Sequence, residues 1–360
     1  MNKQKKVLIV RLDAIGDYVL FRTLLRELRY SDAFKQTHIT LLGNRLWRNL
    51  FETFDADLAD ACIWVNPWDY TKKSFDNLFP YIWRYRPALL WKRHQLRARL
   101  CEARFDLLVL PAIHRHPYME ELFDGVAPAM MGVAVKRPLA TDRLFKYLAP
   151  AQDPTLFTFI QNRLAMEAFT GKKVLGVNRP APFVPTVKKG NFVVLFPGAS
   201  HWTRCWPTKR FAKVAQFIID TMGLEVIITG GKNDIKRAQK IERLVARPQK
   251  IRNEAGQGTL ADMAHRIAGA RMVISNDTCA VHFGAVQCVP TLCITNGISG
   301  RNLFWPYPGE LGLPVHALIP ERFGIKEKGL IETQIRYYLN VLQVSVNDVI
   351  AQIPQRIGKE

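Results

Sequence analysis

Two aspartates that follow the first apolar run of the chain could take part in proton transfer. The loop of residues 11–17 reads RLDAIGD, and its single glycine is Gly16. A dinucleotide-binding loop would need several glycines here, and the carboxylates of Asp13 and Asp17 would repel a phosphate. A carboxylate at the end of a strand can instead accept a proton from a hydroxyl, which makes Asp13 a candidate general base. Helix capping is the alternative for Asp13 and our assignment for Asp17.

A second loop, residues 196–207, is suited to a diphosphate. Backbone N–H groups are accessible at Gly198 and Ala199. Hydroxyl groups and a positive charge come from Ser200, Thr203 and Arg204. A helix that starts near residue 208 would direct the positive end of its dipole at this loop. The alternative is that the two tryptophans of the loop pack between domains and that Arg204 is solvated.

Two further loops follow predicted strands. Asp277 and Thr278 can cap a helix whose free N–H groups would lie beside a second phosphate. His282, on the same helix, is either a reacting group or a packed, hydrogen-bonded side chain. Asp234 follows Gly230-Gly231, and its carboxylate suits the hydroxyl pair of a ribose and equally a helix N-cap.

Two patterns that resemble known sites do not fit their surroundings. Residues 256–261 match G-x-G-x-x-A, but the polar residues 252–254 before them predict no buried strand. Asp55 and Asp57 resemble a metal-binding pair, but they lie in an acidic stretch that we expect to be solvent-exposed. The histidines and cysteines lack the spacing of a zinc site, so no metal is predicted.

Strands and helices must position these loops, and short apolar runs do alternate with longer amphipathic segments. The predicted strands are 7–10, 38–42, 106–110, 192–196, 225–229, 272–275 and 289–294, and the predicted helices are 18–29, 208–222, 234–246 and 260–268. This alternation predicts an α/β protein with two doubly wound, Rossmann-like domains, in which ligands bind at the carboxyl ends of the strands. We place the domains at 1–175 and 192–330, a linker at 176–191 and a C-terminal helical segment at 331–360.

The composition points to an anionic partner. The chain has 51 Lys and Arg against 31 Asp and Glu, a net charge of +20, so nucleic acid, an anionic membrane and a phosphorylated substrate are all open. No stretch reaches the roughly 18 apolar residues of a membrane span, and the first apolar run is too short for a signal peptide. The six cysteines show no paired spacing, which predicts reduced thiols in a cytoplasmic protein.

A basic, aromatic stretch at residues 82–104 is the candidate contact for that partner. Beyond Pro87 it is helix-like, with three leucines that could face inward, namely Leu89, Leu96 and Leu100. Arg93, Arg97 and Arg104 would share another face, which suits anionic headgroups or a phosphorylated glycolipid. The alternative is a solvated basic helix. No RNA- or DNA-recognition motif is present, so no nucleic acid is expected as partner.

The chain contains three blocks in order, VLIVRLDAIGDYVL, VVLFPGASHWTRCWPTKRF and VISNDTCAVHFGA, with ITGGKND and GTLADMAHRIAGA between the last two. Together these blocks resemble glycosyltransferase family 9, the lipopolysaccharide heptosyltransferases. The resemblance implies a GT-B fold, with two Rossmann-like domains facing a central cleft. The first domain would bind the acceptor and the second the nucleotide sugar. It also implies an inverting, metal-independent transfer of heptose from ADP-heptose to the inner core.

The resemblance also implies roles for individual residues. Asp13 takes the position of the general base, and the donor-binding positions fall on Ser200, Arg204, Asp234, Asp277, Thr278 and His282. Two positions depart from the family pattern. Arg204 replaces a lysine, so a planar guanidinium with several N–H groups takes the place of a compact ammonium group. Cys279 replaces a glycine in the pocket for the sugar donor.

The function expected from these observations is an inverting glycosyltransferase without a cofactor. Its partners would be a nucleotide-diphosphate sugar, with ADP-heptose favoured, and an anionic glycolipid acceptor such as the lipopolysaccharide inner core. It would work as a peripheral protein on the cytoplasmic face of the inner membrane. The alternatives are a nucleotide-sugar epimerase of the same architecture and a nucleic-acid-binding protein.

Overall fold

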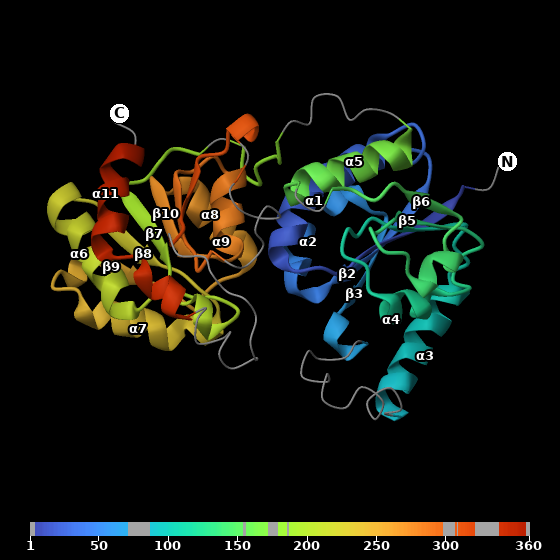
Figure 1. Ribbon diagram of the computed structural model, residues 1–360, viewed down its shortest axis with the longest axis horizontal. Helices are drawn as coiled ribbons and strands as arrows, with labels where there is room; N and C mark the ends of the chain where they lie inside the picture. The colour runs from blue at the N-terminus through green and yellow to red at the C-terminus, as the bar shows by residue number, and fades with distance from the viewer. Residues whose placement is uncertain are drawn as a thin grey trace. The chain divides into compact units, whose positions relative to one another are not determined.

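The chain folds into two compact units, each built on one six-stranded sheet. The computed structural model describes residues 4–70, 87–153, 156–171, 179–185, 187–297, 307, 309–320 and 338–357. Unit 1 is Met1–Asn178 and unit 2 is Arg179–Glu360. Helices cover both faces of each sheet (Figure 1). Every described strand pair is parallel, which confirms the predicted doubly wound α/β fold.

The sheet of unit 1 has the strand order β3-β2-β1-β4-β5-β6. Its strands are β1 (Lys6–Arg11), β2 (His38–Asn44), β3 (Ala61–Val65), β4 (Leu107–Leu110), β5 (Met130–Val133) and β6 (Tyr147–Ala149). Its helices are α1 (Ile15–Tyr30), α2 (Arg48–Phe54), α3 (Pro87–Glu102), α4 (Pro117–Glu120) and α5 (Thr158–Thr170). The order reverses between β1 and β4, so the loops after these two strands adjoin the switch point where such sheets bind ligands.

The sheet of unit 2 repeats this arrangement, in the order β12-β11-β10-β7-β8-β9. Its strands are β7 (Phe192–Phe196), β8 (Glu225–Ile228), β9 (Ile251–Asn253), β10 (Met272–Asn276), β11 (Thr291–Ile294) and β12 (Val315–Leu318). Its helices are α6 (Thr208–Met222), α7 (Ile235–Leu244), α8 (Leu260–Gly269), α9 (Cys279–Val286) and α11 (Val346–Arg356). The switch point of this sheet lies between β7 and β10.

Hydrophobic periodicity explains why these elements form where they do. In α6 the buried residues Phe211, Val214 and Ile218 recur every three to four positions, and they join the core of unit 2. The helix ends at Gly223, whose φ of +67° is a backbone conformation that glycine adopts without strain. Every predicted strand and helix is present, and β7 and α6 have the predicted bounds.

Five short strands were not predicted, namely β3, β5, β6, β9 and β12. A short strand, β9, is separated by two residues from the G-x-G-x-x-A pattern that follows it, but only its first residue, Ile251, is buried. It is therefore not the buried strand that a dinucleotide-binding pattern follows, and as an edge strand it lies two strands away from the switch point of its sheet. A side chain at Gly256 would collide with Ile235, so this glycine serves packing between the loop and the start of α7.

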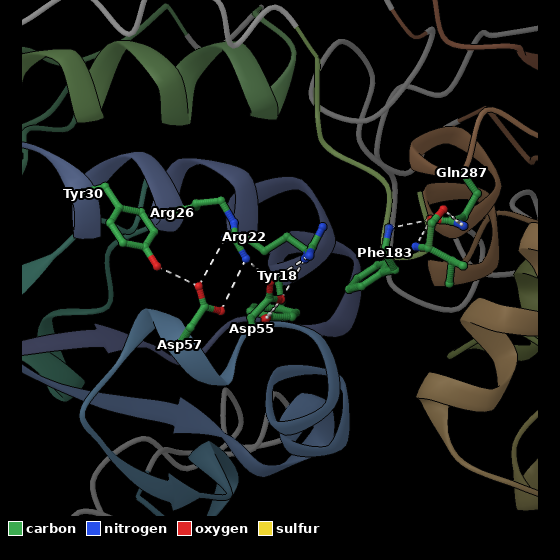
Figure 2. A network of polar contacts seen from close by, with 9 residues as sticks. Tyr18, Arg22, Arg26, Tyr30, Asp55, Asp57, Phe183 and Gln287 are labelled. Carbon is green, nitrogen blue, oxygen red and sulfur yellow. Dashed lines mark hydrogen bonds and ion pairs between the residues drawn. The ribbon is translucent and has the colours of Figure 1, made fainter. Parts of the chain in front are cut away.

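The segments predicted as a linker and as a C-terminal segment pack onto unit 2 in their described parts. The backbone N–H of Phe183 donates to Oε1 of Gln287 at 2.5 Å (Figure 2). The backbone N–H of Gly190 donates to the carbonyl of Gly269 at 2.8 Å. Helix α11 contacts α6 and contributes Val349 and Ile353 to the core. These residues are therefore structural parts of the second unit.

The expected exposure of Asp55 is wrong, because this side chain is fully buried. Its carboxylate lies 2.7 Å from Nη2 of Arg22 and accepts a hydrogen bond from the hydroxyl of Tyr18 at 2.5 Å (Figure 2). Asp57 is exposed as predicted and accepts from the hydroxyl of Tyr30 at 2.8 Å. A buried carboxylate needs such partners to offset the loss of hydration. Because both partners lie on α1, these contacts hold the loop of Asp55 against that helix.

Candidate active site

The candidate base Asp13 lies at the switch point of unit 1 and is held by Arg11. Oδ2 of Asp13 is 2.7 Å from Nε of Arg11, and the side chains are 27% and 2% exposed. Arg11 also donates to the carbonyl of Pro111 at 2.6 Å and lies over the ring of Phe21, 4.2 Å from its centroid. The buried arginine thus fixes a carboxylate that still reaches solvent.

The backbone of Asp13 is fixed as well. Its carbonyl accepts hydrogen bonds from Nδ2 of Asn44 at 3.0 Å and from Nε1 of Trp47 at 3.1 Å. Trp47 in turn stacks on Tyr18, with 4.2 Å between the ring centroids. Both partners come from the end of β2 and the short helix after it, so the neighbouring strand sets the position of this loop.

A second carboxylate belongs to the same site. Asp17 is the third residue of α1, and its pKa is raised to about 6, first by burial and second by the negative charge of Asp13. Arg11 and the backbone amides of Ala14 and Asp17 lower this pKa in part. From the sequence we assigned Asp17 to capping alone and missed it as a candidate base, because a sequence does not show how strongly a side chain is desolvated.

His114, in the loop after β4, is a further residue that was not identified from the sequence. Burial lowers the pKa of His114, whereas the charge of Asp13 opposes that shift, so the imidazole lies within electrostatic reach of Asp13. The next residue, Arg115, anchors this loop through an ion pair with Glu120 at 2.6 Å, and both side chains are almost fully buried. The loops after β1 and β4 therefore form one site with two carboxylates and a neutral imidazole.

In unit 2 the loops after β10 and β7 are joined by Asn276, which was also not identified from the sequence. Nδ2 of Asn276 donates to the carbonyls of Pro197 and Gly198 at 2.8 and 3.2 Å. Its Oδ1 accepts from the backbone N–H of Trp206 at 3.0 Å. The side chain is fully buried and holds both ends of the predicted diphosphate loop at the switch point of the sheet.

Within that loop two of the three predicted phosphate-binding side chains are accessible, whereas Thr203 is buried. Ser200 is exposed and Arg204 is partly exposed, at the end of a short 3-10 helix. Among the described residues, the guanidinium of Arg204 has no ion pair or side-chain hydrogen bond, whereas Thr203 is bound to Nδ1 of His201 at 2.8 Å. Trp206 is buried in the core of unit 2 and donates to the carbonyl of Val344 at 2.8 Å, so it does not pack between domains.

Asp234 connects the loop after β8 to the loop after β7. Its carboxylate accepts from the backbone N–H of Gly231 at 2.9 Å, which confirms a capping role. The same carboxylate lies against Gly198, where any side chain would collide with it. Burial raises the pKa of Asp234, although the Gly231 amide and Arg237 oppose the shift. Contact with a ribose stays a prediction for this residue.

The third loop of unit 2 places the predicted D-T…H residues at the start of α9. The hydroxyl of Thr278 accepts from the N–H of Ala280 and caps the helix as predicted. Asp277 is buried beside it. Burial lowers the pKa of His282 to about 4, and its Nδ1 is hydrogen-bonded to the hydroxyl of Tyr307. His282 is therefore a neutral imidazole at pH 7. This favours its interpretation as a packed, hydrogen-bonded side chain over that as a reacting group.

Cys279, the first residue of α9, stays a neutral thiol. Burial raises its pKa, and the charge of Asp234 adds to the shift. This electrostatic contact also shows that the loops after β8 and β10 approach each other. Ser200, Arg204, Asp234, Asp277 and Thr278 thus lie in the loops that follow three adjacent strands of unit 2, and His282 lies on α9. Among the described residues, no group of three or more His, Cys, Asp or Glu could hold a metal.

The three arginines of the basic stretch do not share one face. Arg93 donates to the carbonyls of Tyr70 and Tyr118 at 2.9 and 2.7 Å and lies over the ring of Tyr118. Arg97 is exposed on α3. Arg104 lies beyond the end of α3 at Glu102, with a φ of +52°, so it does not continue the helix face as predicted.

The buried side of α3 matches the prediction in part. Leu96 and Leu100 are buried as expected, whereas Leu89 is only partly buried. The remainder of the stretch, residues 82–86, lies outside the described residues. In the part of the chain that the structure describes, no helix is long and apolar enough to cross a bilayer.

Solved structures with the same fold place the chain among the GT-B proteins. A family 9 glycosyltransferase from Veillonella parvula superposes with a TM-score of 0.70 at 17% identity, over 99% of this chain and 98% of that one. The E. coli heptosyltransferase WaaC with ADP gives 0.71 at 14% identity, over 98% and 99%. E. coli ADP-heptose LPS heptosyltransferase II gives 0.66 at 17% identity, over 98% of both chains.

A family model matches part of the sequence. Residues 158–295 match the model of glycosyltransferase family 9 (heptosyltransferase), which confirms the resemblance inferred from the three blocks. The chain is therefore a glycosyltransferase with a GT-B fold. No curated protein matches the chain in sequence.

Proposed function

We propose that this glycosyltransferase transfers a heptose from ADP-heptose to an anionic glycolipid acceptor, in the lipopolysaccharide inner core or a related molecule. The observation that carries this proposal is the loop of residues 196–207. It presents Arg204 without an anionic partner among the described residues, and Asn276, at the end of the strand before α9, is hydrogen-bonded to both ends of this loop. The match to a heptosyltransferase family and the similar fold of E. coli WaaC with ADP support the donor.

In the proposed reaction unit 2 binds the donor. Arg204 and the N–H groups at the start of α9 offset the negative charge of the diphosphate as it leaves, without a metal. Asp234 contacts the ribose, and Asp277, Thr278 and the neutral His282 complete the donor site. The acceptor oxygen attacks the anomeric carbon opposite the leaving ADP. One C–O bond forms while the other breaks, and the configuration inverts.

Unit 1 supplies the proton acceptor, which we assign to the Asp13–Asp17 pair. Asp13 is the residue that the sequence favours, and its ion pair with Arg11 holds the carboxylate in place. The charge of Asp13 helps raise the pKa of Asp17 to about 6, and a general base works best when its pKa is close to the working pH. The two carboxylates belong to one site, and we assign the hydroxyl proton to this pair.

The direct test is turnover. Purified protein is incubated with ADP-heptose and core-truncated lipopolysaccharide, and we expect ADP release together with a mass increase of one heptose on the acceptor. Conversion of the donor in the absence of an acceptor would instead indicate an epimerase. Salt-sensitive binding to nucleic acid without binding of sugar nucleotides would contradict the proposal. In the cell we propose that the protein works at the cytoplasmic face of the inner membrane.

A further inference from the structure

One face of α7 is positively charged and lacks acidic partners in the described part of the chain. Lys236, Lys240 and Arg243 are four and three residues apart, so they lie on the same side of the helix. All three are exposed, and with Gln239 and Leu244 they line a shallow depression on the surface of unit 2. We call these five residues the α7 face.

The rest of α7 is fixed against the sheet. Ala238 and Ile241 are completely buried in the core of unit 2, on the opposite side of the helix. The helix has one acidic residue, Glu242, which accepts a hydrogen bond from Nδ2 of Asn253 at 3.1 Å. The α7 face is therefore held outward by packing, and no acid of its own helix neutralises it.

Positive charge continues onto the neighbouring helix. Helices α6 and α7 lie side by side (Figure 1), and α6 exposes Lys209 and Lys213. The exposed acid of α6, Asp220, lies 3.4 Å from Arg247, so it is already paired with a cation beyond the end of α7. Exposed basic residues are thus present on two adjacent helices of this unit.

We propose that the α7 face docks unit 2 onto a bilayer that contains anionic phospholipids. Cations on a helix that lies flat against its own domain complement a plane of phosphate headgroups. The apolar stems of Lys and Arg and the exposed Leu244 can reach the headgroup boundary while the charges stay hydrated. Single-stranded nucleic acid would need aromatic side chains for base stacking, and the α7 face has none.

This inference does not depend on the proposed catalysis, although a lipid-linked acceptor would agree with it. It also differs from the contact predicted on α3, which belongs to unit 1. Because the α7 face is held by packing, docking involves no insertion of the helix into the lipid. The attraction is electrostatic and falls with ionic strength, since the Debye length shrinks to about 3 Å at 1 M salt.

Vesicle flotation with the full chain, in the absence of donor and acceptor, tests the proposal. We expect binding to phosphatidylcholine vesicles that contain phosphatidylglycerol, weak binding to phosphatidylcholine alone, and release by high salt. The double variant Lys240→Glu/Arg243→Glu should bind the anionic vesicles at least about 25-fold more weakly, because each basic residue near such a surface contributes roughly fivefold. The variant Arg97→Glu/Arg99→Glu in α3 tests the competing contact predicted from the sequence, and it should bind within about threefold of wild type because the proposal assigns docking to the α7 face.

Three results would overturn the proposal. The first is that the wild type does not bind anionic vesicles. The second is that the α7 double variant binds them as strongly as the wild type does. The third is that the α3 variant loses more vesicle binding than the α7 variant. Preferred binding of the wild type to duplex DNA would assign the surface to nucleic acid instead. If charge reversal lowers the melting temperature, Lys240→Gln/Arg243→Gln removes the charges without adding repulsion. Turnover of a soluble acceptor should stay at the wild-type level in both α7 variants, which separates docking from catalysis.

Discussion

The two units have the same strand order but opposite chemistry at the same place. At the switch point of unit 1, Arg11 is buried and paired with Asp13. The groups that remain to determine the charge of this site are the carboxylates of Asp13 and Asp17. At the switch point of unit 2 the arginine is accessible, while a neutral amide, Asn276, holds the loop. The topology determines where a site can form, and the loop side chains decide whether its charge is negative or positive.

Removing both carboxylates of unit 1 gives the largest expected effect. Asp13→Asn/Asp17→Asn keeps the shape of both side chains but removes the proposed base, so kcat should fall roughly 10²–10⁴-fold. The affinity for ADP, measured by calorimetry, should change little because that site belongs to unit 2. If the double variant keeps the wild-type kcat, the two carboxylates are not the base, and the proposed difference between the sites of the two units is wrong.

The pH dependence sharpens the role of Asp17. Its pKa is raised to about 6, so kcat should fall as the pH is lowered through 6, and Asp17→Asn should abolish that step. An acid with a raised pKa binds more protons in the folded state between its ordinary pKa and 6. Stability therefore declines as the pH rises through this window. Asp17→Asn should melt at a higher temperature than wild type at pH 7.5, but not at pH 3.5.

Loss of the accessible arginine of unit 2 should weaken donor binding. A hydrogen bond to a charged group contributes about 1.5–3 kcal/mol, so Arg204→Ala should bind ADP roughly 10–100-fold more weakly. Arg204→Lys should retain part of the affinity, because it keeps the charge without the planar fork. Lys213→Ala, an exposed control on α6, should bind ADP as the wild type does.

A change at Asn276 should act through the position of the loop. Asn276→Asp replaces the donor to Pro197 and Gly198 with a buried charge, so we expect ADP affinity to fall roughly tenfold with a lower melting temperature. Asn253→Asp, at the end of edge strand β9, is the matched control and should leave ADP affinity unchanged. Equal losses from both variants would mean that Asn276 supports the sheet in general and not the donor loop.

The smallest expected effect is at Cys279. Because burial raises the pKa of its thiol, no thiolate forms near neutral pH, and alkylation by iodoacetamide at pH 7.5 should be slow. Cys279→Ser should change ADP affinity by less than about threefold. Fast alkylation, or a large loss of affinity, would show that this side chain takes part in the chemistry of the donor site.

Much of the fold could be predicted from the sequence, because long amphipathic helices and buried parallel strands have strong periodicity. The short strands β3, β5, β6, β9 and β12 have three to five residues each and lie toward the edges of the sheets, where the apolar pattern is weak. Arg104 was misplaced because nothing in the residue pattern marked the end of α3 at Glu102.

The position of a candidate residue could be predicted only where its own loop determines it. The accessibility of Arg204 and the capping of α9 by Thr278 both follow from a loop that joins a strand to a helix. The bridging role of Asn276, the raised pKa of Asp17 and the burial of Asp55 depend on residues that are distant in the chain. Such effects come from tertiary packing, which one sequence does not display.

The close contact between Gly198 and Asp234 limits how this enzyme could be redesigned. Any larger residue at position 198 must push the Asp234 carboxylate aside, so a change in the diphosphate loop also alters the group proposed to contact the ribose. Attempts to broaden the range of accepted nucleotides should therefore vary positions 198 and 234 together.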